Sequence, residues 1–284
     1  MNDQDYVILL TLYETKNITK AARKLYLSQP TLSKKLKNIE TELGTELFIR
    51  SKKGVLPTPL GESIIPYIQI ISSNTKAMKE FIASNQGYIG GTLTIGISIN
   101  YSEYRLSEVI KEYTLNYPNV ELKIIVDQSR NLYRMLNNNE LSIALVRGDF
   151  QWDEGKIFLN EEPVCLVTSH ENASRPINSY PYIKRYTDSA FYSMITKWMI
   201  ENEISTENSK LRVDNIKTCL KLTKEGLGWC ILPQICLDDF DGYIHPLYFQ
   251  NGDPFTRSSY ILYRHSYFEL PQVKLFVNEI LAMK

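Results

Sequence analysis

The chain has 284 residues, 43% of them hydrophobic, and no formal net charge; this length predicts about two or three folded units. No apolar run approaches the ~20 residues of a membrane helix, which excludes a membrane-spanning protein. The four cysteines are too few for a disulfide framework in a chain of this size, so we expect a cytoplasmic protein.

The absence of net charge hides a strong separation of charge along the chain. Residues 16–53 carry ten Lys or Arg and three Glu, a local charge of +7, whereas residues 54–284 carry a small acidic excess. A cationic patch confined to one short segment is typical of a DNA-binding module on a body that does not bind DNA. The alternative is a solvated charged face.

Three short helices are predicted at the N-terminus. Asp3 can cap the first, whose inner side carries Tyr6, Leu9, Leu10 and Tyr13. Asn17 can cap the second, in which Ala21 and Ala22 allow another helix to approach closely. Tyr26 and Leu27 then form a tight connection, an arrangement that favours a helix-turn-helix.

The third helix carries the predicted contacts to DNA. Ser28 is a favourable N-cap and Pro30 is tolerated in the first turn. A buried stripe at helical spacing is expected to contain Leu32, Leu36, Ile39 and Leu43. The opposite face offers amide, hydroxyl and cationic groups, which suit base edges and phosphates, from Gln29, Thr31, Ser33, Lys34 and Lys37. Gly44 is expected to end the helix, and residues 47–56 predict two strands around a basic turn, a wing.

One run resembles a known family. It reads Ala21-Ala22-x-x-Leu25-x-x-Ser28-Gln29-Pro30-x-Leu32-Ser33-x-x-Leu36-x-x-Ile39-Glu40-x-x-Leu43-Gly44-x-x-Leu47-Phe48-x-Arg50, and it is similar to the N-terminal signature of LysR-type transcriptional regulators. The family pattern then continues Leu-Thr-x-Ala-Gly, of which Pro57-Thr58-Pro59-Leu60-Gly61 keeps only Thr and Gly. We expect the groove to be faced by Gln29, Pro30, Thr31, Ser33 and Lys34, and phosphates to be held by Lys37, Arg50, Lys52 and Lys53.

A long helix is predicted to follow this winged module of residues 1–58. Thr58 can cap it, and residues 59–86 carry an a/d seam of Ile64, Ile68, Ile71, Thr75, Met78 and Ile82. Pro66 should kink its first turns or delay the regular helix. The seam favours dimerisation, which the resemblance also implies; the alternative is packing on the same chain.

Residues 87–91 are glycine-rich and predict a hinge, after which residues 92–284 alternate strands and helices. Strands are predicted at 93–97, 120–126, 141–146, 163–168, 229–232 and 259–263, and helices at 106–113, 132–136, 192–201, 216–225 and 273–281. This pattern implies a mostly parallel α/β sheet. The resemblance implies a two-lobed, periplasmic-binding-protein-like effector domain, with lobe I at about 92–161 and 267–284 and lobe II at about 162–266. It also implies that the last helix packs on the first lobe.

A small-molecule site is expected between the lobes, beyond the carboxyl ends of the strands. The hydrogen-bonding candidates are Ser98, Asn100, Ser129 and Ser189, and Arg147 is a candidate charge partner for a carboxylate or another anion. Ser129 and Ser189 could instead merely cap helices, and Arg147 could pair with a surface acid.

Other patterns argue against an enzyme. His170, His245 and His265 are scattered, and no phosphate-binding loop, dinucleotide fingerprint or nucleophile elbow occurs, so we expect no catalytic residue, metal or cofactor. Cys230 and Cys236 could form a redox pair, but Cys230 lies in an apolar run and is expected to be buried and inert.

These patterns together predict a ligand-responsive transcription regulator that binds an inverted repeat in double-stranded DNA as a homodimer or homotetramer. The alternative is a small-molecule-binding or catalytic α/β protein with an N-terminal helical interaction module. Binding to promoter DNA that weakens steeply with salt would separate the two.

Overall fold

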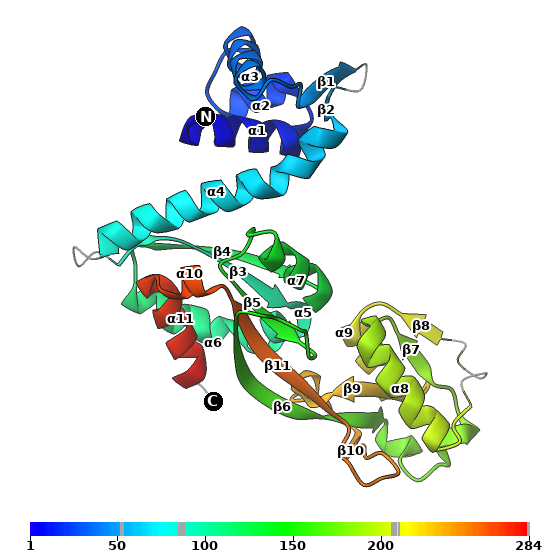
Figure 1. Ribbon diagram of the computed structural model, residues 1–284. Helices are drawn as coiled ribbons and strands as arrows, with labels where there is room; N and C mark the ends of the chain where they lie inside the picture. The colour runs from blue at the N-terminus through cyan, green and yellow to red at the C-terminus, as the bar shows by residue number, and fades with distance from the viewer. Residues whose placement is uncertain (52–53, 85–88, 206–208, 210, 283–284) are drawn as a thin grey trace.

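The computed structural model describes residues 1–51, 54–84, 89–205, 209 and 211–282. They form a small N-terminal module, one long helix, and an α/β body of two lobes (Figure 1). Over these described residues, no helix is both long enough and apolar enough to cross a membrane.

The N-terminal module is a winged helix-turn-helix. It contains α1 (Asp3–Thr15), α2 (Ile18–Lys24), α3 (Gln29–Leu43), β1 (Phe48–Ser51) and β2 (Gly54–Pro57). The predicted caps Asn17 and Ser28 are confirmed, since their side chains accept hydrogen bonds from the first turns of α2 and α3. The prediction for Asp3 is wrong. Asn2 caps α1 instead, because its side chain accepts from the second and third amides of the helix.

The buried stripe of α3 is one residue shorter than predicted. Leu32, Leu36 and Ile39 are buried, but Leu43 is 42% exposed because it is the last helical residue. Gly44 ends the helix in the left-handed conformation, with φ of 69°, as predicted. The carboxylate of Glu40 accepts hydrogen bonds from the amides of Leu47 and Phe48 at 2.8 and 3.0 Å, and these bonds attach the wing to α3.

The long helix α4 (Pro59–Ser84) leaves the module without delay and continues through Pro66. The Thr58 hydroxyl accepts from the Gly61 amide at 2.9 Å, which confirms the predicted cap. A Cβ at Gly61 would lie 2.1 Å from the carbonyl oxygen of Leu47, so no larger residue fits where helix and wing meet.

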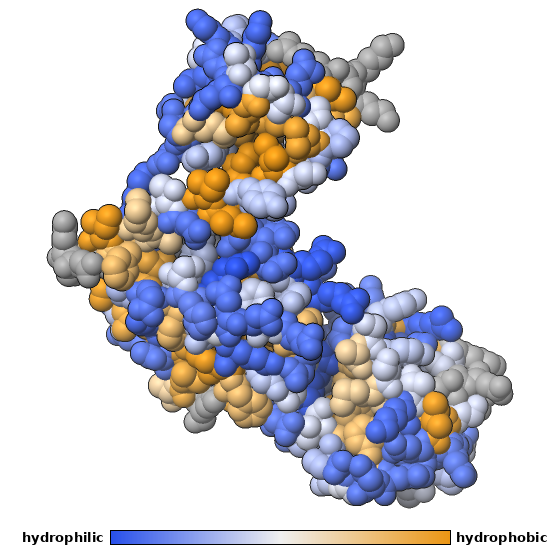
Figure 2. Space-filling view, in the orientation of Figure 1, coloured by the Kyte–Doolittle hydropathy of each residue, from blue (hydrophilic) through white to orange (hydrophobic). Residues whose placement is uncertain are grey.

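The predicted seam of α4 divides into two parts. Ile68 is buried in the core of the module and Ile64 packs against the same core, so these two pack on their own chain. Ile71, Met78 and Ile82 are 44%, 55% and 54% exposed. Figure 2 shows hydrophobic side chains gathered along this helix and the adjoining face of the module; the exposed ones include Val7, Tyr67, Ile70 and Phe81.

A seven-stranded mixed sheet runs through both lobes of the body. Its strands are β3 (Gly91–Ser98), β4 (Val120–Asp127), β5 (Ile143–Arg147), β6 (Gly155–Thr168), β9 (Cys230–Pro233), β10 (Tyr243–Pro246) and β11 (Thr256–Tyr263). The order is β10-β6-β11-β5-β3-β4, with β9 also paired to β6. Within this sheet, the expected parallel pairing holds only for β4-β3-β5. The other pairs in this sheet are antiparallel, because β6 and β11 run through both lobes as long crossing strands.

Helices and a second small sheet cover this framework. The first lobe carries α5 (Ile99–Tyr104), α6 (Leu106–Asn116), α7 (Ser129–Asn137), α10 (His265–Phe268) and α11 (Pro271–Ala282), and the second carries α8 (Ser189–Glu201), α9 (Ile216–Lys224), β7 (Ile183–Arg185) and β8 (Leu211–Val213). The last helix packs on the first lobe, as predicted. Phe276 of α11 lies edge-on to Tyr113 of α6, whose hydroxyl donates to the Gln272 carbonyl at 2.7 Å.

Candidate functional site

The outer face of α3 is polar and open to solvent. Its exposed residues are Gln29, Pro30, Thr31, Lys34 and Lys37, and Ser33 is half-buried. Neither Lys34 nor Lys37 forms an ion pair with any residue in the described part of the chain. Their charges are therefore available to an external partner, whereas Lys35 on the same helix turns toward α1 and donates to the Gln4 side chain at 3.3 Å.

Only part of the wing lies within the described residues. Arg50 lies in β1, which pairs with β2. Lys52 and Lys53 fall outside the described residues, so the predicted phosphate contacts of this turn stay predictions.

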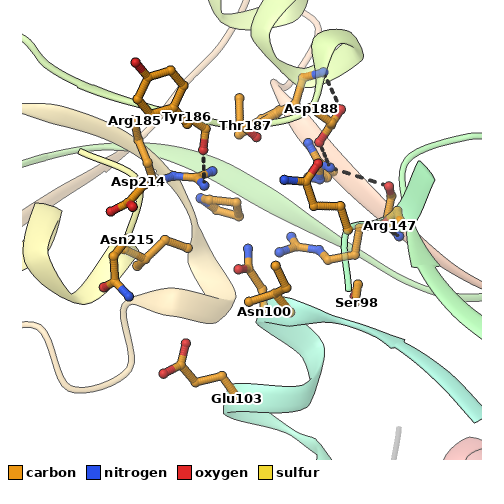
Figure 3. A pocket seen from close by; sticks show the side chains of 17 residues that line it. Ser98, Asn100, Glu103, Arg147, Arg185, Tyr186, Thr187, Asp188, Asp214 and Asn215 are labelled. Atoms are coloured by element: carbon orange, nitrogen blue, oxygen red, sulfur yellow. Dashed lines mark hydrogen bonds and ion pairs between the residues drawn. The ribbon is translucent and has the colours of Figure 1, made fainter. Parts of the chain in front are cut away.

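A pocket of about 150 Å³ lies between the two lobes (Figure 3). Ser98, Asn100, Ser129 and Arg147, all predicted from the sequence, line it together. Ser189 does not; this exposed residue begins α8, while its neighbour Asp188 lines the pocket and caps that helix by accepting from the Phe191 amide at 2.9 Å. The expectation that Ser189 binds a ligand is therefore not supported.

Four α-helices begin at the pocket. Helix α5 follows Ser98, α7 begins at Ser129, α8 follows its cap Asp188, and α9 follows its cap Asn215. Their N-terminal amides carry partial positive charge, which favours an anion between the lobes. The Ser129 hydroxyl already accepts from the Arg147 amide at 2.9 Å, so it also joins α7 to the end of β5.

Two arginines of the pocket are paired with acids. Arg147 is 3% exposed and its guanidinium donates to Glu162, a buried acid and not a surface one. Burial lowers the pKa of Arg147 and raises the pKa of Glu162, because the loss of hydration outweighs their mutual attraction. Arg257 binds Asp188 at 2.5 Å. Burial opposes ionisation of Asp188, but Arg257 and the Phe191 amide together lower its pKa.

Sequence reasoning missed several lining residues. Glu103 comes from α5 in the first lobe, and the others come from the second lobe and the crossing strands: Arg185, Tyr186, Asp214, Asn215 and Arg257. The helix-capping pattern could have identified Asn215, since it precedes α9 and accepts from the Thr218 amide at 3.1 Å. No local pattern marks Arg185 or Arg257, because each reaches the pocket from a strand whose place depends on distant pairing.

The cysteines and the potential metal ligands were the other candidates for site chemistry. All four cysteines are buried free thiols, and the prediction that Cys230 is buried is confirmed. Within the described part of the chain, no group of three or more His, Cys, Asp or Glu side chains is arranged to hold a metal ion.

Known proteins share both parts of this architecture. Residues 86–283 match the LysR substrate binding domain, and residues 4–62 match the bacterial regulatory helix-turn-helix protein, lysR family. The uncharacterized HTH-type transcriptional regulator YkuM of Bacillus subtilis (strain 168) is 32% identical over 286 residues, which cover 100% of this chain and 98% of that protein. YraN from the same organism, also described as an uncharacterized HTH-type transcriptional regulator, is 29% identical over 98% of this chain and 96% of its own length.

Solved structures show the same fold at lower identity. A full-length OxyR variant from Pseudomonas aeruginosa aligns with a TM-score of 0.76 at 21% identity, covering 99% of this chain and 94% of that chain. Full-length CbnR, in complex with its target DNA, aligns with a TM-score of 0.65 at 14% identity over the whole of both chains. Because the two family matches cover the module and the body, the protein belongs to the LysR family of DNA-binding transcriptional regulators with an effector-binding domain.

Proposed function

We propose that this regulator reads an inverted repeat by placing α3 in the major groove of each half-site. Gln29, Pro30, Thr31, Ser33 and Lys34 face the bases in this proposal, and Lys37, Arg50, Lys52 and Lys53 hold phosphates. The observation that carries it is the exposed polar face of α3, whose two outward lysines have no acidic partner within the described chain. Such a face suits both phosphate binding and base contacts.

The body supplies the response to a small molecule. The effector is an organic anion that binds between the lobes, and the pocket's arginines and helix N-termini support that proposal. An anion that contacts both lobes favours their closed arrangement, and this shift changes how the DNA-binding modules are placed. The pocket is a binding site and not a catalytic one in this proposal, in keeping with a family of regulators.

Two further assignments follow. The exposed side chains Ile71, Met78 and Ile82 of α4 pair two copies of the chain, whereas Ile64 and Ile68 mainly support the module. The chain divides by function into residues 1–58 for DNA, 59–86 for dimerisation, a hinge at 87–91 and an effector domain at 92–284; residues 85–88, at the junction of the helix and the hinge, lie outside the described residues. A protein that binds promoter DNA in this way works in the cytoplasm in this proposal.

A pair of lysine variants tests the DNA assignment. Lys34→Ala removes one outward cation from α3, and Lys35→Ala removes one that is turned toward α1. The full-length variants are titrated with the promoter DNA of the protein's own gene across a range of salt concentrations. We expect Lys34→Ala to weaken binding severalfold because it removes a cation that faces the groove, whereas Lys35→Ala leaves the affinity nearly unchanged.

The rival function is a small-molecule-binding protein whose helical module serves another partner. It predicts no salt-dependent DNA binding by the unmodified protein. Equal loss of affinity in the two lysine variants would instead show that α3 contributes general charge and is not oriented in a groove.

A further inference from the structure

The third arginine of the pocket differs from the other two. Arg185, at the end of β7 in the second lobe, has no carboxylate within ion-pair distance among the residues the structure describes. One terminal nitrogen donates to the Tyr186 carbonyl at 2.9 Å, and Nε is buried without an acceptor. Arg147 and Arg257 are already neutralised by Glu162 and Asp188, so the positive charge that remains in the pocket is that of Arg185, a half-buried side chain whose Nε atom is fully buried.

The remaining acids do not cancel this charge. Glu103 lines the pocket but binds Lys217 at 2.6 Å. Asp214 is exposed at the pocket and makes no ion pair within the described chain, so water screens it. The buried part of the site therefore carries an excess of one positive charge.

The opposite wall needs hydrogen-bond acceptors. The Ser98 hydroxyl and two guanidinium nitrogens of Arg147, Nε and Nη1, are buried without a partner. Both residues stand at the ends of strands in the first lobe, and Figure 3 shows Arg147 and Arg185 entering the pocket from opposite sides. Unsatisfied buried donors are costly. A ligand oxygen that accepts hydrogen bonds from them would therefore contribute more binding free energy than the same bonds made to donors exposed to water.

We propose that the effector is a small organic monoanion whose charged group binds Arg185 and whose second, uncharged oxygen accepts from Arg147 and Ser98. This inference rests on the proposed effector site and names its ligand class and the residue that recognises the charge. The ligand bridges the lobes, because Arg185 belongs to one and Ser98 to the other. A cavity of about 150 Å³ suits a molecule near the size of benzene, such as a small hydroxy or oxo acid.

The same charges exclude two other ligand classes. A neutral molecule leaves the half-buried charge of Arg185 without a counter-charge. A dianion brings a second negative charge, which Arg147 and Arg257 cannot neutralise because each is already paired with an acid. Affinity should therefore be highest for the singly charged member of a set of similar molecules.

Two sets of probes test this preference in the full-length protein by calorimetry. One set is 2-hydroxybutyrate, 2-hydroxybutanamide and malate; the other is 2-hydroxybenzoate, 2-hydroxybenzamide and phthalate. In at least one set we expect the monoanion to bind at least about tenfold more tightly than both the neutral and the doubly charged molecule. Equal affinity within both sets, or no binding by either monoanion, would overturn the proposal.

Variants then identify the residue that binds the charge. Arg185→Gln should weaken the preferred monoanion at least about tenfold, and Arg185→Lys should recover part of the loss because it restores the charge without the planar guanidinium. Arg212→Gln is the matched control, an exposed arginine on the neighbouring strand β8 that does not line the pocket. Unchanged affinity in Arg185→Gln would contradict the assignment.

The stability of Arg185→Gln without ligand shows whether a loss of affinity comes from the lost charge or from damage to the fold. Urea unfolding of Arg185→Gln should show no loss of stability, because the variant removes a half-buried charge that has no acidic partner among the described residues. A large loss would mean that Arg185 is structural and would overturn the assignment. Promoter DNA binding by the unmodified protein and by the Arg212→Gln control is measured in the absence of probe. A failure of the DNA-binding function is therefore distinct from a failure of this ligand assignment.

Discussion

The DNA-facing side of α3 and the pocket between the lobes are both polar and cationic, but they are built in opposite ways. The α3 face comes from residues 29–37, is open to water, and leaves its outward lysines without acidic partners in the described chain. The pocket gathers residues from 98 to 257, and two of its three arginines are buried against acids. The α3 face therefore suits a large polyanion, and the pocket suits a small ligand with few charges.

This difference has an energetic consequence. Exposed lysines cost little to keep unpaired because water solvates them, so such a surface can be changed without harm to the fold. Buried arginines must be compensated, so a change in the pocket affects stability as well as binding. Substitutions on the exposed face of α3 should therefore change DNA affinity without changing the stability of the fold. Substitutions of paired charges in the pocket should change both ligand affinity and stability. Arg185 is the exception in the pocket, because it has no acidic partner in the described chain.

The largest effect is expected for Arg147→Gln. It leaves Glu162 buried without its partner and should lower the free energy of unfolding of the body by about 3–5 kcal/mol. Tryptophan fluorescence during urea unfolding reports this directly, since the three tryptophans, at 152, 198 and 229, all lie in the body. Replacing both partners by leucine should recover most of the loss; a stable single variant would contradict the buried ion pair.

Adjacent residues of α3 should show the contrast within a single helix. Leu32 is fully buried, so Leu32→Ala should destabilise the module by about 2–5 kcal/mol, seen as faster hydrogen exchange in α2 and α3. Thr31→Ala lies on the exposed face and should change stability by about 0.5 kcal/mol or less while it weakens promoter binding. The comparison fails if Thr31→Ala unfolds the module, or if it leaves DNA affinity unaltered.

The smallest effect concerns acid. Because the pKa of Asp188 is lowered in the folded state, its ionised form contributes stability that is present above the ordinary aspartate pKa and lost as pH falls through the folded value. Asp188→Asn keeps the helix cap but weakens the bond to Arg257, and should cost about 1 kcal/mol at pH 7. Urea unfolding at several pH values should show this difference shrinking as the solution becomes acidic. A difference that grows toward low pH would show that the ion pair is not the cause.

Local interactions explain why much of the module followed from the sequence alone. Ser28 and Asn17 cap helices through bonds within three residues, Gly44 ends α3 through its own backbone conformation, and the apolar spacing of α3 determines which face is buried. The same kind of reasoning placed Ser98, Asn100, Ser129 and Arg147 at the pocket, because strand ends of one parallel unit meet at one edge. It failed at Leu43 and Ser189, which lie at helix ends where one residue of displacement changes exposure.

Sequence by itself therefore determined the helix-turn-helix, its outward polar face and the alternating strands and helices of the body, since each depends on neighbours a few residues apart. Only the tertiary structure decided which arginines are neutralised. Glu162 reaches Arg147, and Asp188 reaches Arg257, across separations that no local pattern encodes. The crossing strands β6 and β11 bring these charges together. Among the pocket's three arginines, this leaves Arg185 of β7 as the one without an acidic partner in the described chain.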